Sequence, residues 1–166
     1  MVESERINNL LYTNSMTSQD LADSSANCNN YIYFSFEAEF FDVDIVTSTL
    51  HLEPTAVRIR QHPAPKSTAW IYRVDAGEDF DLEIQLEKLI DIFNSKVVEI
   101  NRLKEQLSIE TLLQFVIDID IRPDSSTPYF GLNKRTINFL SKTNTEVDFD
   151  LYKIGRIGLA DDLIEE

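Results

Sequence analysis

Residues 109–121 read IETLLQFVIDIDI, and this stretch decides the fold. Its odd-numbered positions are apolar, with Thr111 as the single exception. A period of two in β-branched and aromatic residues predicts a half-buried strand. Because the strand is long, we expect it to have neighbours on both edges. The polar residues of its other side are Glu110, Gln114, Asp118 and Asp120.

Length and composition indicate one globular domain with extensions at both ends. The 166 residues, 43% hydrophobic and 27% charged, are enough to bury one core. Residues 1–30 are rich in Ser, Asn, Thr and Asp, and we expect them to form a flexible N-terminal arm. Residues 31–153 are expected to form a single α+β domain. Residues 154–166 then form an acidic C-terminal tail.

The N-terminus and the cysteine content favour a cytoplasmic protein. The sequence has no apolar run near the ~20 residues that a membrane-spanning helix needs. Its first residues, MVESER, lack the basic and apolar regions of a signal peptide. The single cysteine, Cys28, cannot form an intramolecular disulfide, which agrees with a reducing compartment.

The net charge is the most informative bulk property. The 29 acidic and 15 basic side chains give a formal charge of −14. A negative potential of this size disfavours nucleic acid and anionic membranes as partners, and it attracts a basic protein. Solubility alone would also explain an acidic surface. The sequence leaves the oligomeric state open.

The remaining patterns predict an α+β fold. Strands are expected over residues 31–41, 57–61, 69–74, 109–121, 129–132 and 147–151. Helices are expected to follow caps at Asp42 or Asp44, at Asp79, at Asn94–Ser95 and at Asn133. Each helix has one apolar stripe that cannot remain in water. We therefore expect a mostly antiparallel sheet of about six strands, with the helices packed on one face.

The C-terminal half resembles a bacterial family known only as domain of unknown function 4279. The resemblance is carried by the TPYFGLNK motif at residues 127–134, the INFL motif at 137–140 and the VDFDLY strand at 147–152. Leu52-Glu-Pro-Thr55 and Trp70 agree with the same family, and the match covers residues 31–153. It supports the architecture. It implies no activity, cofactor or catalytic residue.

Paired carboxylates are the best candidates for a functional site. In three predicted strands, acidic residues recur two positions apart, so both members of a pair point to the same face, opposite the apolar one. If these strands are neighbours, the carboxylates form a band that suits a docking surface for a basic protein, a hard-cation site or an acid–base pair. An ordinary solvated face of a sheet would show the same pattern. The six residues are Glu37, Glu39, Asp118, Asp120, Asp148 and Asp150.

Other residues offer less chemistry. Arg58, Arg60 and His62 share one side of a strand and are expected to pair with the acidic strands. The two histidines, His51 and His62, match no zinc spacing, and the four glycines form no phosphate-binding loop. We therefore assign no metal site and no cofactor. Tyr31, Tyr33, Trp70, Tyr72 and Tyr129 either line a recognition surface or pack at the rim of the sheet.

These patterns favour a non-enzymatic protein-binding module. An immunity- or inhibitor-like protein that offers carboxylates to a basic partner accounts for the charge and for the lack of a catalytic constellation. The alternative is an enzyme of unknown reaction that uses strand carboxylates or a divalent metal ion. Self-association through the acidic face is a third arrangement, opposed by like-charge repulsion.

Overall fold

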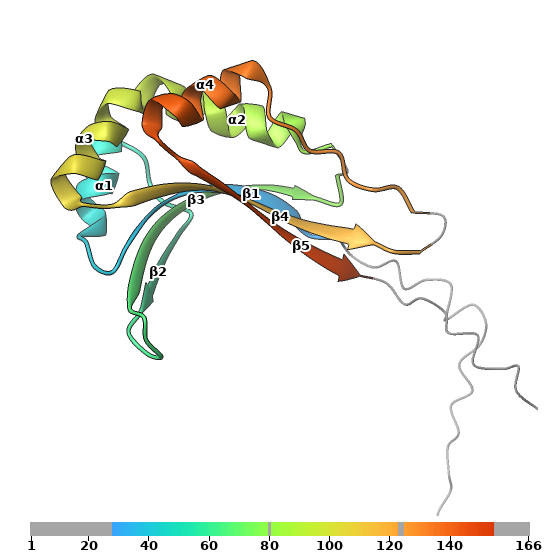
Figure 1. Ribbon diagram of the computed structural model, residues 1–166, viewed down its shortest axis with the longest axis horizontal. Coiled ribbons are helices and arrows are strands. Elements are labelled where there is room, and N and C mark those ends of the chain that lie inside the picture. Colours follow the sequence, from blue (N-terminus) through green and yellow to red (C-terminus); the bar gives the residue numbers. More distant parts are fainter. Residues whose placement is uncertain (1–27, 80, 123–124, 155–166) are drawn as a thin grey trace, which may run out of the picture.

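The fold has two layers, a β-sheet and a layer of helices on one of its faces (Figure 1). The computed structural model describes residues 28–79, 81–122 and 125–154, so most of the expected arm and tail lies outside the described residues. The predicted α+β fold is confirmed. The strands are β1 (Asn30–Ala38), β2 (Ala56–Arg60), β3 (Ser67–Gly77), β4 (Glu110–Asp120) and β5 (Glu146–Ile154). The helices are α1 (Val43–Leu50), α2 (Glu83–Phe93), α3 (Val97–Leu107) and α4 (Lys134–Thr143), with a 3-10 turn η1 (Asn94–Lys96) between α2 and α3.

The strand order is β2-β3-β1-β4-β5. The first three pairings are antiparallel, and β4 pairs with β5 in parallel. A parallel pair cannot be joined by a tight turn, and the connection through α4 provides the crossover that it needs. The organising strand β4 therefore has neighbours on both edges, as its length predicts.

The described residues form five strands, and the sixth predicted strand, residues 129–132, is wrong. Tyr129 makes a single isolated parallel bridge to Asp81, and its carbonyl accepts a hydrogen bond from the Leu82 amide at 3.1 Å. Pro128 immediately before it has no amide hydrogen to donate to a ladder. The segment is held at the start of α2 and does not extend the sheet.

The predicted helix caps are confirmed at two of the four helices. Asp42 accepts a hydrogen bond from the Asp44 amide before α1, and Asn133 accepts one from the Thr136 amide before α4. The caps predicted at Asp79 and at Asn94–Ser95 are wrong, because α2 begins after Leu82 and α3 after Lys96, and neither Leu82 nor Lys96 makes a side-chain cap. Ile137 of α4 is 51% exposed. The side of α4 that packs inward carries Thr136, Phe139, Leu140 and Thr143.

Aromatic side chains join the helix layer to the sheet. Phe34, at the middle of β1, is fully buried, and its ring centroid lies 4.5 Å from that of Phe93 in α2 and 5.8 Å from that of Phe139 in α4. Trp70 of β3 is also fully buried, and its indole N–H donates to Thr47 of α1 at 3.0 Å. All four helices therefore contribute to one core on one face of the sheet.

Lys104 of α3 fixes the start of β5. Its ammonium group donates to the carbonyl oxygens of Thr143 and Asn144 at 3.2 and 2.7 Å, where α4 ends, and it lies 3.1 Å from a carboxylate oxygen of Glu110. These carbonyls lack partners within their own helix, so a charged donor satisfies them. This contact ties α3 to the end of α4, just before β5 begins.

The other face of the sheet has no helix over it in the described chain (Figure 1). β2 and β3 bend away from the helix layer (Figure 1). The helix-free face of the sheet is therefore concave. Within the described ranges, no helix has the length and apolar character needed to cross a membrane.

Candidate binding surface on the open face of the sheet

We call the helix-free side of the sheet the open face. Side chains alternate along each strand, and the register places the outward-facing residues of neighbouring strands beside one another. Its central part consists of Ala56 and Arg58 of β2, Ile71, Arg73 and Asp75 of β3, Tyr31, Tyr33 and Glu37 of β1, Gln114, Val116 and Asp118 of β4, and Asp148, Asp150 and Tyr152 of β5.

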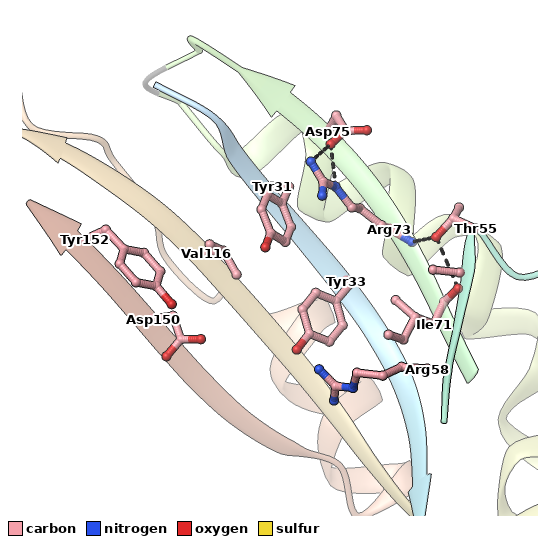
Figure 2. Close-up of a pocket in the computed structure, with 11 residues that line it drawn as sticks. Tyr31, Tyr33, Thr55, Arg58, Ile71, Arg73, Asp75, Val116, Asp150 and Tyr152 are labelled. Carbon is pink, nitrogen blue, oxygen red and sulfur yellow. Dashed lines mark hydrogen bonds and ion pairs between the residues drawn. The ribbon is translucent and has the colours of Figure 1, made fainter. Parts of the chain in front are cut away.

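A pocket of ≈ 570 Å³ lies across this face and touches all five strands. Figure 2 shows Tyr31 and Tyr33 in its middle, with Arg58 and Arg73 toward β2 and β3, and Asp150 and Tyr152 toward β5. The pocket therefore has two arginines and Asp75 on one side, the rings of Tyr31 and Tyr33 in the middle, and Asp150 on the other side.

The two arginines of the pocket are already paired within the chain. Arg58 lies 3.5 Å from a carboxylate oxygen of Glu37, two strands away, because the intervening residue of β3 is the small Ala69. Arg73 donates to Asp75, and its guanidinium carbon lies 3.5 Å from the ring centroid of Tyr31. The pairing predicted between Arg58 and an acidic strand is confirmed. Arg60 instead donates to the carbonyl of Pro65.

The phenol of Tyr33 is sensitive to these charges. Burial raises the pKa of Tyr33 above its ordinary value, the negative charge of Glu37 raises it further, Arg58 opposes the change, and Tyr31 and Asp150 add smaller upward contributions. A raised pKa favours the neutral phenol in the folded state. The contribution of the neutral Tyr33 phenol to the stability of the fold is fully present below the ordinary tyrosine pKa of about 10. It is lost as the pH rises through the raised pKa of Tyr33 in the folded state.

We expect Asp150→Asn to lower the pKa of Tyr33, and Glu37→Gln to lower it more, because each removes a negative charge that disfavours the phenolate. The measurement is an NMR titration of tyrosine ring carbons, with Tyr33 assigned from its absence in Tyr33→Phe. Glu105→Gln, on the far side of the helix layer, is the control and should leave the titration unchanged. A Tyr33 pKa that does not respond to either variant would place both carboxylates too far from the phenol.

Three of the six predicted carboxylates lie on β4 and β5 on the open face. Asp148 and Asp150 project from β5, opposite Gln114 and Val116 of β4, and Asp118 of β4 lies opposite Tyr152. Asp118 accepts a hydrogen bond from the Asn29 amide at 2.8 Å. Within the described chain, no cation lies at ion-pair distance from Asp148 or Asp150. The negative charge of this side of the open face is therefore not neutralised by its own neighbours.

The other three predicted carboxylates are dispersed. Glu37 lies near the C-terminal end of β1 and pairs with Arg58. Glu39 follows the end of β1 and borders a separate pocket of ≈ 320 Å³. Asp120 is buried, and hydrogen bonds from the side chain and backbone of Arg122 hold its pKa well below the ordinary range, against the opposing effect of burial. The predicted band of six carboxylates is thus reduced to three residues spread along β4 and β5.

Metal-ligating side chains do not converge in the part of the chain that the structure describes. No group of three or more His, Cys, Asp or Glu residues there is placed to hold a metal ion. His51 ends α1 in the left-handed conformation, with φ of 51°, and His62 lies in the exposed β2–β3 loop. Neither histidine faces the carboxylates of β5.

Tyr152, Arg73 and Asp75 line the pocket but are not among the site residues predicted from the sequence. Tyr152 lies two positions after Asp150 and therefore shares its face, which the strand pattern could have indicated. Arg73 and Asp75 have the same spacing, but the strand predicted over residues 69–74 ends before Asp75. The structure continues β3 to Gly77, whose φ of 60° ends the strand.

A family model described as a domain of unknown function, DUF4279, matches residues 26–153. The protein belongs to the DUF4279 family. The match includes every strand residue of the sheet except Ile154, and it confirms the resemblance seen in the motifs of the C-terminal half. Comparison with curated proteins and with solved structures gives no match. The DUF4279 assignment carries no activity, so the function has to be argued from the open face.

Proposed function

We propose that this DUF4279 protein is a non-enzymatic, cytoplasmic binding module whose open face docks a basic protein, in the manner of an immunity or inhibitor protein. The observation that carries the proposal is the charge balance within the open face. Arg58 and Arg73 have partners in Glu37 and Asp75, whereas Asp148 and Asp150 have no cation at ion-pair distance among the described residues. The charge available to a partner is therefore negative.

The rest of the open face has the character of a recognition surface. It is curved, it carries exposed or half-exposed tyrosines, and no helix of the described ranges covers it. Tyrosine is favoured at the centre of protein interfaces because it combines a large apolar area with a polar end. The overall charge of −14 has the same sign as the free carboxylates, so long-range attraction would guide a basic partner toward the molecule.

Retention of a partner at controlled ionic strength tests the proposal. The full-length tagged protein is immobilised and exposed to lysate of its source organism at ~0.01 M salt, then washed at ~1 M salt, across which the Debye length falls from ~30 to ~3 Å. We expect a basic protein to be retained at low salt and released at high salt. The absence of any retained basic protein at low salt would contradict the proposal.

The alternative class, a carboxylate- or metal-dependent enzyme, is tested separately by calorimetric titration with Mg²⁺, Mn²⁺ and Ca²⁺. Saturable heat that disappears in Asp118→Asn or Asp148→Asn would favour a metal site over a docking surface. The binding proposal expects no such heat, because a docking surface offers scattered carboxylates and not a closed oxygen shell.

A further inference from the structure

We propose that the acidic half of the open face is built to take one arginine side chain of the partner, with the guanidinium group stacked against Tyr33 and Tyr152 and paired with Asp150. This inference rests on the proposed function and specifies which group of a basic protein is recognised. We call the position the arginine slot, formed by Tyr33, Val116, Asp150 and Tyr152.

The register of the sheet gives the slot its shape. Val116 of β4 lies between Tyr31 of β1 and Asp150 of β5, and its side chain is 8% exposed, so it forms a floor. Tyr33 and Tyr152 stand on the two strands that flank β4. Figure 2 shows the hydroxyl end of Tyr152 beside Asp150, with Val116 between β5 and Tyr31. A long, flat side chain fits between these walls better than a compact one.

The same face already binds a guanidinium group with the same residue types. Arg73 lies over the Tyr31 ring at 3.5 Å and pairs with Asp75, so an aromatic ring and an aspartate from neighbouring strands hold one arginine. The row that runs across the sheet from Asp75 through Tyr31 and Val116 ends in a second aspartate, Asp150. Asp75 pairs with Arg73 of the same chain. We infer that Asp150 pairs with an arginine of the partner.

Arginine suits this slot better than lysine or a metal ion. Its planar group can accept a carboxylate through two parallel N–H donors while its flat face packs on a ring, which a compact ammonium cannot do. A divalent ion would need several oxygen ligands at once, and the described residues bring no such group together. Asp118 and Asp148, which lie on the same side of the open face, add attraction for a cation.

The test uses N-acetyl-L-arginine amide as the probe, because it presents one guanidinium group on a neutral backbone. It is titrated into the isotopically labelled full-length protein and followed by NMR. We expect saturable shifts at Tyr33, Val116 and Tyr152, with millimolar affinity. Asp150→Asn should weaken the binding about tenfold or more, as expected for loss of one partner of a charge-assisted pair. Glu105→Gln, a matched loss of one charge on α3, should leave it unchanged.

Two further probes make the result specific. N-acetyl-citrulline amide has nearly the same shape without the charge and should give no saturable shift, and N-acetyl-lysine amide should bind several-fold more weakly than the arginine probe. Equal binding of all three probes, or shifts that spread over the helix layer, would overturn the inference. If the arginine probe fails to bind while a basic partner is still retained at low salt, the arginine slot is wrong and the docking function stands. If the arginine probe binds and no basic partner is retained at low salt, the arginine slot stands and the docking function is wrong.

Discussion

Phe34→Ala is expected to lower the free energy of unfolding by about 3–5 kcal/mol, the range for removing a large aromatic side chain from a packed core. Phe34 is fully buried at the middle of the central strand. Its ring lies 5.4 Å from Phe36 in the same strand, 4.5 Å from Phe93 and 5.8 Å from Phe139, measured between ring centroids. The cavity left behind would therefore face the strand and two helices, whose backbones cannot all move inward to fill it.

Chemical denaturation followed by tryptophan fluorescence measures this loss, since Trp70 is buried in the same core. Phe40→Ala is the matched control, because the same atoms are removed from a side chain that is 82% exposed, and we expect a change within about 0.5 kcal/mol. An equal effect of the two substitutions would mean that the helix layer does not pack on β1 as described.

The layer arrangement could be predicted from periodicity because both faces of β1, β4 and β5 are marked in the sequence. Ile32, Phe34 and Phe36 face the helices, and Tyr31 and Tyr33 face the open side, as the alternation predicts. The caps at Asp42 and Asn133 were also visible, since the side chain of each bonds to a nearby backbone amide. These features are local in the chain, so a single sequence contains them.

Element ends were harder to predict, because this chain rarely uses glycine to stop a helix. The left-handed position after α1, α3 and α4 is taken by His51, Ser108 and Asn144, with φ between 46° and 51°. Asparagine is a known substitute for glycine there, but histidine and serine give little warning. The false strand at residues 129–132 is a short aromatic segment, and among the described residues it makes only the isolated bridge between Tyr129 and Asp81.

The candidate site shows the same division between local and non-local information. Spacing alone put Asp148 and Asp150 on the face opposite the apolar residues of β5. Spacing could not reveal which acidic residues have a basic neighbour, because that depends on strand order. Arg58 reaches Glu37 over Ala69 only because β2, β3 and β1 are consecutive in the sheet. Pairing of Glu37 with Arg58 and of Asp120 with Arg122 leaves Asp118, Asp148 and Asp150 as predicted carboxylates of the open face that have no cation at ion-pair distance in the described chain.

The double variant Asp148→Asn/Asp150→Asn is expected to weaken binding of the basic partner by about 10- to 100-fold at low salt. Charge pairs across a protein interface are worth ~1.5–7 kcal/mol when close, and exposed ones ~0.2–1 kcal/mol, so two carboxylates at a partly open surface together supply roughly one to two powers of ten. Most of the loss should appear in the association rate and in a flatter dependence on salt, because attraction at a distance acts before contact. Surface plasmon resonance at several ionic strengths measures both.

The control for this variant has the same change in net charge. Glu83→Gln/Glu105→Gln removes two exposed carboxylates from α2 and α3, on the opposite side of the sheet from the open face. If docking depended only on the total charge of the molecule, both double variants would weaken binding equally. If docking uses the open face, the β5 variant should lose affinity and the helix variant should keep it. The two surfaces lie on opposite sides of the core, so solvent ions screen the charges of one from a partner bound at the other. Equal losses would therefore contradict the assignment of the binding surface, even if a basic partner exists.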